Sequence, residues 1–205
     1  MKARYDDLDT YIADLKAEIT ARPDCAGHHY NLGLAYLSKR DFLEAEKAFL
    51  EAVALSPHLA EAYVQLGGIA MQRGDFEGCL NYNREAVNAR PRFAIGWGNI
   101  GFAHLQRGEP EEAIAALTKA LKWDPGFIQA RATIATAYLM LGDAEKSAAL
   151  SEKAIAMEPA FAPAHNNLAV ALLELGDKEK AKTHARLALE YGYDVDPKIR
   201  EELGL

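Results

Sequence analysis

The chain has 205 residues, of which 50% are apolar and 26% are charged, and this is the composition of a globular protein. Alanine is frequent and there are only eight prolines, which favours an all-helical class over a β-sandwich or a β-barrel. The formal net charge of −7 disfavours nucleic acid as a partner, and no apolar stretch is long enough to insert into a membrane.

Residues 1–25 predict one helix, near 3–21. No apolar run there resembles a signal peptide, so we expect a cytoplasmic protein, although a leader cleaved ahead of residue 1 would leave no trace. We interpret this helix as an N-terminal cap on the repeats described next, and a short coiled-coil dimer seam is the alternative. Both interpretations rest on apolar residues spaced by three and four, which share one helical face: Tyr5, Leu8, Ile12, Leu15 and Ile19.

The rest of the chain contains an internal repeat. Five prolines follow one another at intervals of 34 residues, which chance does not produce: Pro23, Pro57, Pro91, Pro125 and Pro159. We therefore expect five copies of one structural unit inside a single domain that spans residues 1–205. At this period the copies occupy 26–59, 60–93, 94–127, 128–161 and 162–195, and residues 196–205 form a C-terminal cap.

Four other places of the block keep their residue type. The seventh place is leucine or isoleucine, the eighth is glycine or alanine, the twentieth is small, and the twenty-seventh is always alanine. Small residues opposite large ones allow two antiparallel helices to approach closely. Cys79 occupies a twentieth place, so we expect it to be buried and unreactive, with Cys25 more exposed. Their spacing supports neither a disulfide framework nor a zinc site.

Each block also predicts where its helices break. Glycine ends the first helix in a left-handed turn, the acid after it caps the second helix, and the proline stops the second helix. Four blocks carry the glycine–acid pair and the first carries Arg40-Asp41: Gly74-Asp75, Gly108-Glu109, Gly142-Asp143 and Gly176-Asp177. The predicted helices are 26–39, 42–55, 60–73, 76–89, 94–107, 110–123, 128–141, 144–157, 162–175, 178–191 and a short cap at 197–203, with no strand.

The residue types that recur at these places of the 34-residue block resemble the tetratricopeptide repeat, and the resemblance covers almost the whole chain. It implies an all-α, right-handed α-solenoid of five helix pairs, in which the first helices line a concave groove and bind other proteins. The third block matches the signature places best: Trp97, Ile100, Gly101, Ala113, Ala120 and Pro125. Five residues depart from the signature, three where an aromatic is usual and two where a large apolar residue is usual: His29, Arg131, His165, Asn83 and Ser151.

The resemblance places the sixth residue of each block on the groove wall. An amide or a hydroxyl stands there in every block, and such a row can pair with the backbone of an extended peptide. Asparagine is nevertheless common at this place in the family, so a purely structural role is the alternative. The predicted row is Asn31, Gln65, Asn99, Thr133 and Asn167.

The fifth and ninth places are less ordinary, because two glycines stand there. Glycine inside a helix costs about 1 kcal/mol relative to alanine, so Gly68 and Gly98 need a reason. We predict that they leave a hollow for one apolar side chain of a partner, and close approach of neighbouring helices is the alternative. The hollow would be bordered by Tyr30, Leu34, Ile95 and Phe102.

No catalytic, metal or cofactor site is predicted. The segment Gly96–Gly101 matches the dinucleotide fingerprint, but it lies inside a predicted helix with no strand before it. No two of the six histidines are three or four residues apart, so no helix presents a chelating pair. No serine follows the nucleophile-elbow pattern. We therefore expect that the chain is not an enzyme.

The sequence thus predicts a protein–protein interaction module, an adaptor, assembly factor or scaffold that holds an extended segment of a partner in its groove. The carboxylate clamp of chaperone-binding relatives is disfavoured, because Tyr30 and Leu34 stand where that clamp needs lysine and asparagine. The alternative is a self-assembling structural scaffold that forms homo-oligomers through its caps or its convex face.

Overall fold

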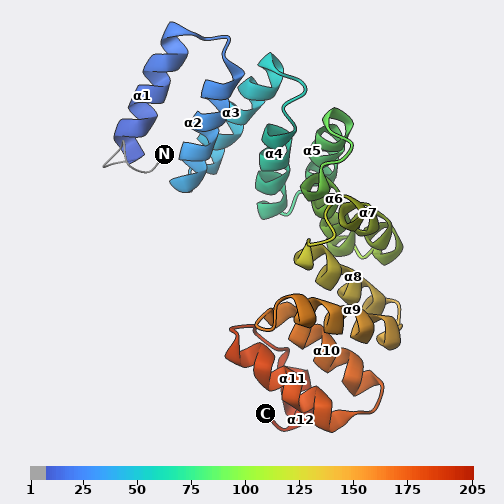
Figure 1. Ribbon diagram of the computed structural model, residues 1–205. Helices are drawn as coiled ribbons and strands as arrows, with labels where there is room; N and C mark the ends of the chain where they lie inside the picture. The colour runs from blue at the N-terminus through green and yellow to red at the C-terminus, as the bar shows by residue number, and fades with distance from the viewer. Residues whose placement is uncertain (1–7) are drawn as a thin grey trace. The chain divides into compact units, whose positions relative to one another are not determined.

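The computed structural model describes residues 8–205, and within them it contains twelve α-helices and no strand. The predicted all-α helical-repeat fold is therefore confirmed. The chain forms two compact units, one up to Asn99 and one from Ile100, which are described separately below (Figure 1). The helices are α1 Leu8–Ala21, α2 Ala26–Ser38, α3 Phe42–Leu55, α4 Ala60–Gln72, α5 Phe76–Ala89, α6 Ala94–Gln106, α7 Pro110–Trp123, α8 Ile128–Met140, α9 Ala144–Met157, α10 Ala162–Glu174, α11 Lys178–Glu190 and α12 Pro197–Leu203.

The predicted helix boundaries are confirmed to within one residue from α2 onward. Each first helix of a pair ends one residue earlier than predicted, because the fourteenth residue of the block serves as its C-cap, as Lys39 does for α2. The predicted start of the N-terminal helix at residue 3 lies outside the described residues, and α1 is described from Leu8. The helix boundaries could be predicted this closely because proline and glycine recur at fixed places of the block, and both residue types determine the local backbone conformation.

The turn inside each repeat is left-handed, as the glycine column predicts. Its glycines have φ between 74° and 85°, and Arg40 takes the same conformation with a φ of 60°. Four turns also carry the predicted helix cap, an aspartate whose carboxylate accepts a hydrogen bond from the backbone N–H three residues later: Asp41, Asp75, Asp143 and Asp177. Glu109 makes no such cap, and its carboxylate lies 2.6 Å from Nδ1 of His104 instead.

A hydrogen bond across the repeat junction explains three of the departures from the family signature. The fourth residue of four blocks places a ring or guanidinium nitrogen 2.9–3.0 Å from the carbonyl of the proline six residues earlier. A carbonyl oxygen can only accept, so each nitrogen donates an N–H. The pairs are His29–Pro23, Trp97–Pro91, Arg131–Pro125 and His165–Pro159. Histidine and arginine therefore do here what tryptophan does in the third block.

Inside a pair, the eighth residue of the block faces the twenty-fourth. A Cβ added to Gly33 would lie 2.5 Å from the ring of Phe49, and one added to Gly67 would lie 2.2 Å from Nδ2 of Asn83. In the second unit, a Cβ on Gly101 would lie 2.4 Å from Leu117. Glycine is thus required where the facing side chain is large. The fifth block has alanine at both places, and Ala169 and Ala185 share one buried cluster.

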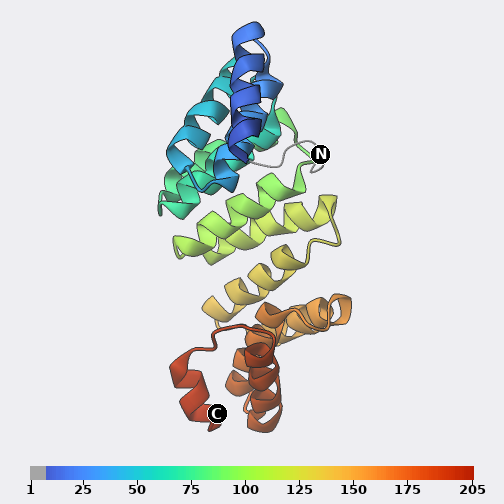
Figure 2. The ribbon, with the colours of Figure 1, turned by 90° about the vertical axis from the view of Figure 1, so that its left-hand side faces the viewer.

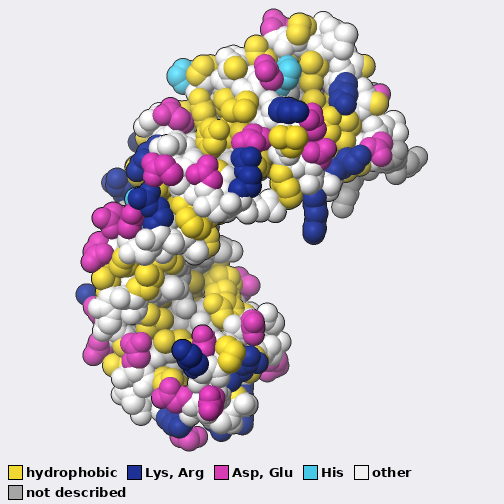
Figure 3. All heavy atoms as spheres, turned by 180° about the vertical axis from the view of Figure 1, so that it is seen from behind, with side chains coloured by type: hydrophobic (Ala, Val, Ile, Leu, Met, Phe, Trp, Pro, Cys, Tyr) yellow, Lys and Arg dark blue, Asp and Glu magenta, His cyan; other side chains and the backbone are white. Residues whose placement is uncertain are grey.

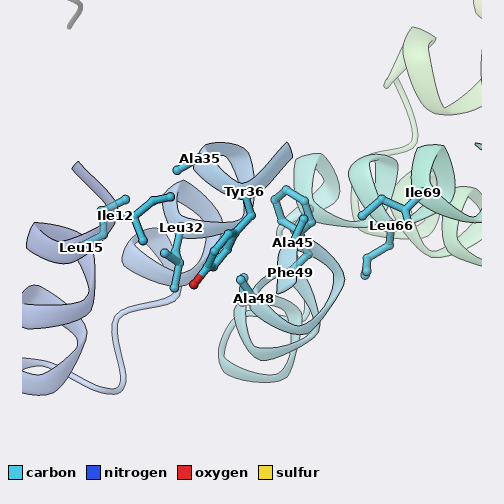
Figure 4. Close-up of a cluster of buried hydrophobic side chains, with 12 residues drawn as sticks. Ile12, Leu15, Leu32, Ala35, Tyr36, Ala45, Ala48, Phe49, Leu66 and Ile69 are labelled. Atoms are coloured by element: carbon cyan, nitrogen blue, oxygen red, sulfur yellow. The ribbon is translucent and has the colours of Figure 1, made fainter. Parts of the chain in front are cut away.

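The N-terminal unit begins with the predicted cap. Ile12 and Leu15 of α1 are 6% and 3% exposed, and they pack against Leu32 and other residues of α2 (Figure 4). The same cluster continues through Phe49 of α3 into α4. The apolar stripe of α1 is therefore buried within its own chain, which is the arrangement that a cap requires and that a coiled-coil seam would not leave.

The C-terminal unit ends with the second cap, α12, which lies beside α11 (Figure 2). Leu203 is 2% exposed and joins a cluster with Ala181 and Ala185 of α11. Ile199 packs against the same cluster. The short helix therefore covers the outer apolar face of the last repeat, as predicted.

Candidate functional site

The first helices of the N-terminal unit carry eight of the predicted groove residues. Two of these, Tyr30 on α2 and Gln65 on α4, are brought near each other, and the Gln65 side chain acts to lower the pKa of the Tyr30 hydroxyl. Burial and the negative charge of Glu61 nevertheless raise the pKa of Tyr30 above its ordinary value, so the hydroxyl stays protonated and can donate. Asn31 and Leu34 lie half-buried on α2 beside this pair in sequence. The eight predicted groove residues of α2, α4 and the start of α6 are together called the first-helix wall below: Tyr30, Asn31, Leu34, Gln65, Gly68, Ile95, Gly98 and Asn99.

The two wall glycines lie in different environments. Gly68 is exposed, and a Cβ added to it would meet no atom within 4 Å. Gly98 is buried, so a side chain there would not project into solvent. Ile95, one turn before Gly98 on α6, is 48% exposed. Open space on the wall is therefore found at Gly68.

Asn99 belongs to a buried hydrogen-bonded chain that fixes its orientation. Asn83 is fully buried, and its Nδ2 donates to the carbonyl of Cys79 over 2.8 Å. Its Oδ1 must then accept, and it accepts from Nδ2 of Asn99 over 3.1 Å. The Asn99 amide nitrogen is thus held toward Asn83, and its carbonyl oxygen is the group that could accept a further hydrogen bond. Such an oxygen pairs with a backbone N–H.

In the C-terminal unit, the residues of the predicted amide row make hydrogen bonds within the protein. Asn167 is 5% exposed, and its Nδ2 donates to the carbonyl of Ala132 over 2.9 Å and to the hydroxyl of Thr136 over 3.0 Å. These bonds join α10 to α8, so Asn167 has a structural role here. Thr133 donates its hydroxyl to the Gln129 carbonyl of its own helix, and Phe102 on α6 is 42% exposed.

Charges on and near the wall are paired. Glu61 lies 2.7 Å from Arg90, and Arg73 binds Glu46 through two guanidinium nitrogens. Lys39 binds Asp9 of α1. Figure 3 shows the same mixture on one face of the N-terminal unit, where basic and acidic side chains alternate with apolar ones. A ligand for this wall would therefore be selected more by hydrogen bonds and apolar contacts than by net charge.

Sequence reasoning missed one cluster. His165 of α10 and His184 of α11 lie with their Nδ1 atoms 3.0 Å apart, although they are 19 residues apart in sequence. A spacing of three or four residues identifies only pairs of histidines on one helix, so it does not reveal a pair on two helices. Among the described residues no group of three or more histidine, cysteine, aspartate or glutamate side chains could hold a metal ion, and no helix is both long and apolar enough to cross a membrane.

These features define an all-α helical-repeat protein whose helix pairs recur every 34 residues. Sequence models described as tetratricopeptide repeat match residues 12–60, 30–86, 64–126, 104–150 and 150–183. The chain therefore belongs to the tetratricopeptide repeat family. Repeats of this family typically form interaction modules rather than catalytic sites. The comparison with curated proteins gives no match.

Many solved structures share the fold. MamA is 24% identical, with a TM-score of 0.70, and the match covers 78% of this chain and 94% of MamA. YrrB, described as a TPR protein with an unusual peptide-binding site, is 16% identical with a TM-score of 0.74 over 93% of this chain and 97% of YrrB. PilF of Pseudomonas aeruginosa is 17% identical with a TM-score of 0.76 over 90% and 86%. At these identities the likeness is one of fold.

Proposed function

We propose that the chain is a protein-interaction module that binds an extended segment of a partner on the first-helix wall of the N-terminal unit. The observation that carries the proposal is the open space at Gly68, on a wall whose polar side chains are already held in place. The Tyr30–Gln65 pair and the oriented carbonyl oxygen of Asn99 offer hydrogen bonds to a peptide backbone. The exposed Ile95 offers apolar contact. YrrB, with its peptide-binding site, supports the same type of ligand.

The experiment is peptide selection followed by titration. Peptides would be selected from a displayed random library on the purified chain, and their dissociation constants measured by fluorescence anisotropy. Gly68→Leu should weaken binding by about tenfold or more, because the leucine fills the open space that the ligand would occupy. Leucine favours a helix over glycine, so the fold should be kept.

A matched control is available in the same repeat. Asn88 is exposed on α5, the second helix, so Asn88→Leu adds a leucine of the same size away from the wall. This variant should bind like the parent protein. Equal affinity of the parent and of Gly68→Leu would contradict the proposed site, and equal weakening by both leucines would point to a nonspecific effect.

Self-assembly is the second candidate, and exposed apolar side chains favour it. Leu43 and Leu50, seven residues apart on α3, are 62% and 41% exposed. In the C-terminal unit, Leu141 and Leu175 occupy the fourteenth place, which is basic in the first three blocks, and are 42% and 45% exposed. Sedimentation velocity over a wide concentration range tests this candidate, since a monomer throughout would exclude it and a reversible series of oligomers would support it.

A further inference from the structure

The C-terminal unit contains a pair of histidines that joins two helices. His165 of α10 is 3% exposed, and His184 of α11 is half-buried beside it. The two rings are stacked, with centroids 5.2 Å apart and an interplanar angle of 25°, and the two Nδ1 atoms are 3.0 Å apart. A distance of 3.0 Å between two nitrogens is that of a hydrogen bond, so one of the two must carry the proton.

The proton positions follow from a third contact. Nε2 of His165 lies 2.9 Å from the carbonyl oxygen of Pro159, which can only accept, so Nε2 carries a hydrogen and donates. A neutral His165 then has a bare Nδ1, which accepts. His184 must therefore be protonated on Nδ1 and donate to His165. When both rings are neutral, they are therefore of opposite tautomer.

Few groups compensate a charge at this place. Glu152 of α9 is the acidic residue whose charge acts on His184. From α10 the facing titratable group is His165 itself, and the Tyr191 ring at the end of α11 lies 5.5 Å from it. α12 packs Ile199 and Leu203 against the neighbouring part of α11. Burial, followed by the charge of His165, lowers the pKa of His184 below its ordinary value of 6.5, and Glu152 offsets this only in part.

We propose that the His165–His184 pair is a pH-sensitive latch that fastens α11 to α10 at neutral pH and releases it in mild acid. One added proton leaves the hydrogen bond in place, because one of the two Nδ1 atoms is still bare and accepts. When both rings carry a second proton, neither Nδ1 atom can accept. Two N–H groups then face each other across 3.0 Å, and two positive charges share a largely buried site, so the bond is lost.

The direction of the effect follows from linkage. Folded His184 binds a proton less readily than the same residue in the unfolded chain, because its pKa is lowered from the ordinary value of about 6.5. The contribution of the pair is therefore fully present above about pH 6.5 and is lost as the pH falls below it. Release of α11 would also free α12, because Leu203 packs in one cluster with Ala181 and Ala185 of α11. The apolar face that α12 covers would then be exposed.

Hydrogen exchange of the full chain tests the latch. After correction for the intrinsic pH dependence of exchange, protection of the α11 amides should fall between pH 7.5 and pH 5.5 by several-fold more than that of α8. His184→Asn should abolish this excess, because an asparagine amide donates to Nδ1 of His165 but does not titrate. His58→Asn, at an exposed loop histidine of the other unit, should keep it.

Three results would overturn the proposal. The first is an equal loss of protection in α8 and α11, and the second is the same excess loss in His184→Asn as in the parent. The third comes from long-range proton–nitrogen spectra of the parent at neutral pH, which report which ring nitrogen is protonated. They should show His165 protonated on Nε2 and His184 on Nδ1. If both rings carry their proton on Nε2, no hydrogen bond joins them and the latch does not exist.

Discussion

The two adjacent glycines of α4 provide a comparison in which one substitution should have opposite effects at neighbouring residues. Alanine in place of a helical glycine gains about 1 kcal/mol, because the glycine loses more backbone entropy on folding. At Gly68 nothing opposes this gain, since the new Cβ meets no atom within 4 Å. Gly68→Ala should therefore raise the free energy of unfolding by about 0.5–1 kcal/mol.

At Gly67 the same gain is opposed by a clash. The new Cβ would lie 2.2 Å from Nδ2 and 3.1 Å from Cγ of Asn83. Asn83 is fully buried and is held at both ends of its amide, by the Cys79 carbonyl and by Asn99. It cannot move aside without giving up a buried hydrogen bond, so the overpacking should cost about 1–3 kcal/mol. The free energy of unfolding of Gly67→Ala should thus be about 1–3 kcal/mol lower than that of Gly68→Ala.

The assay is urea unfolding followed by circular dichroism, with stability taken from the midpoint at unchanged slope. A double variant identifies the clashing partner. Gly67→Ala combined with Asn83→Ser should lose less stability than the sum of the two single changes, since the shorter side chain leaves room for the Cβ. Equal stabilisation by Gly67→Ala and Gly68→Ala would refute the clash with Asn83. So would a double variant whose loss of stability equals the sum of the two single losses.

Three further predictions concern other parts of the repeats. Arg40→Gly should raise the free energy of unfolding by up to about 1 kcal/mol, because Arg40 has a φ of 60°, and Gly74→Ala at a φ of 76° should lower it by about as much; equal urea midpoints would contradict this. Ala120 is fully buried on α7, so Ala120→Leu should cost about 1–3 kcal/mol, whereas Ala115→Leu on the exposed side of the same helix should change the thermal melt little. Cys79 is 1% exposed and burial raises its pKa to about 11, so thiol labelling of the folded protein should modify Cys25 first, and equal rates would refute the packing of Cys79.

The fold could be predicted from the sequence because its determinants are local. A proline or a glycine restricts the backbone wherever it stands, so columns such as that of Pro91 and Gly108 give helix ends directly. The hydrogen bonds between repeat residues were not predicted. His29 and Arg131 depart from the aromatic residue that is usual at this place, yet each donates to a proline carbonyl as Trp97 does. The fourth residue of the block needs a planar side chain whose N–H can reach the carbonyl of the proline six residues earlier. Histidine, arginine and tryptophan all meet this need, and their different residue types do not show it.

The site could be predicted only in part, because identical residues in one column meet different neighbours. Asn99 and Asn167 both stand at the sixth place of their blocks. Asn99 donates its amide N–H to Asn83, and its carbonyl oxygen is the group that we propose for a ligand. Asn167 donates its amide N–H groups to the hydroxyl of Thr136 and to the carbonyl of Ala132, and these hydrogen bonds join α10 to α8.

The facing residue, and not the place in the block, thus decides which hydrogen bonds a side chain makes within the protein. Asn83 shows this most clearly, because it stands where a large apolar residue is usual. As a buried amide it requires the glycine at residue 67 and orients Asn99 on the wall. Replacing Asn83 by leucine, the residue that faces Gly101 in the third block, would restore the usual packing and remove the bond to Asn99. We expect such a variant to fold and to bind selected peptides more weakly than the parent, and unchanged binding would show that Asn99 needs no fixed orientation.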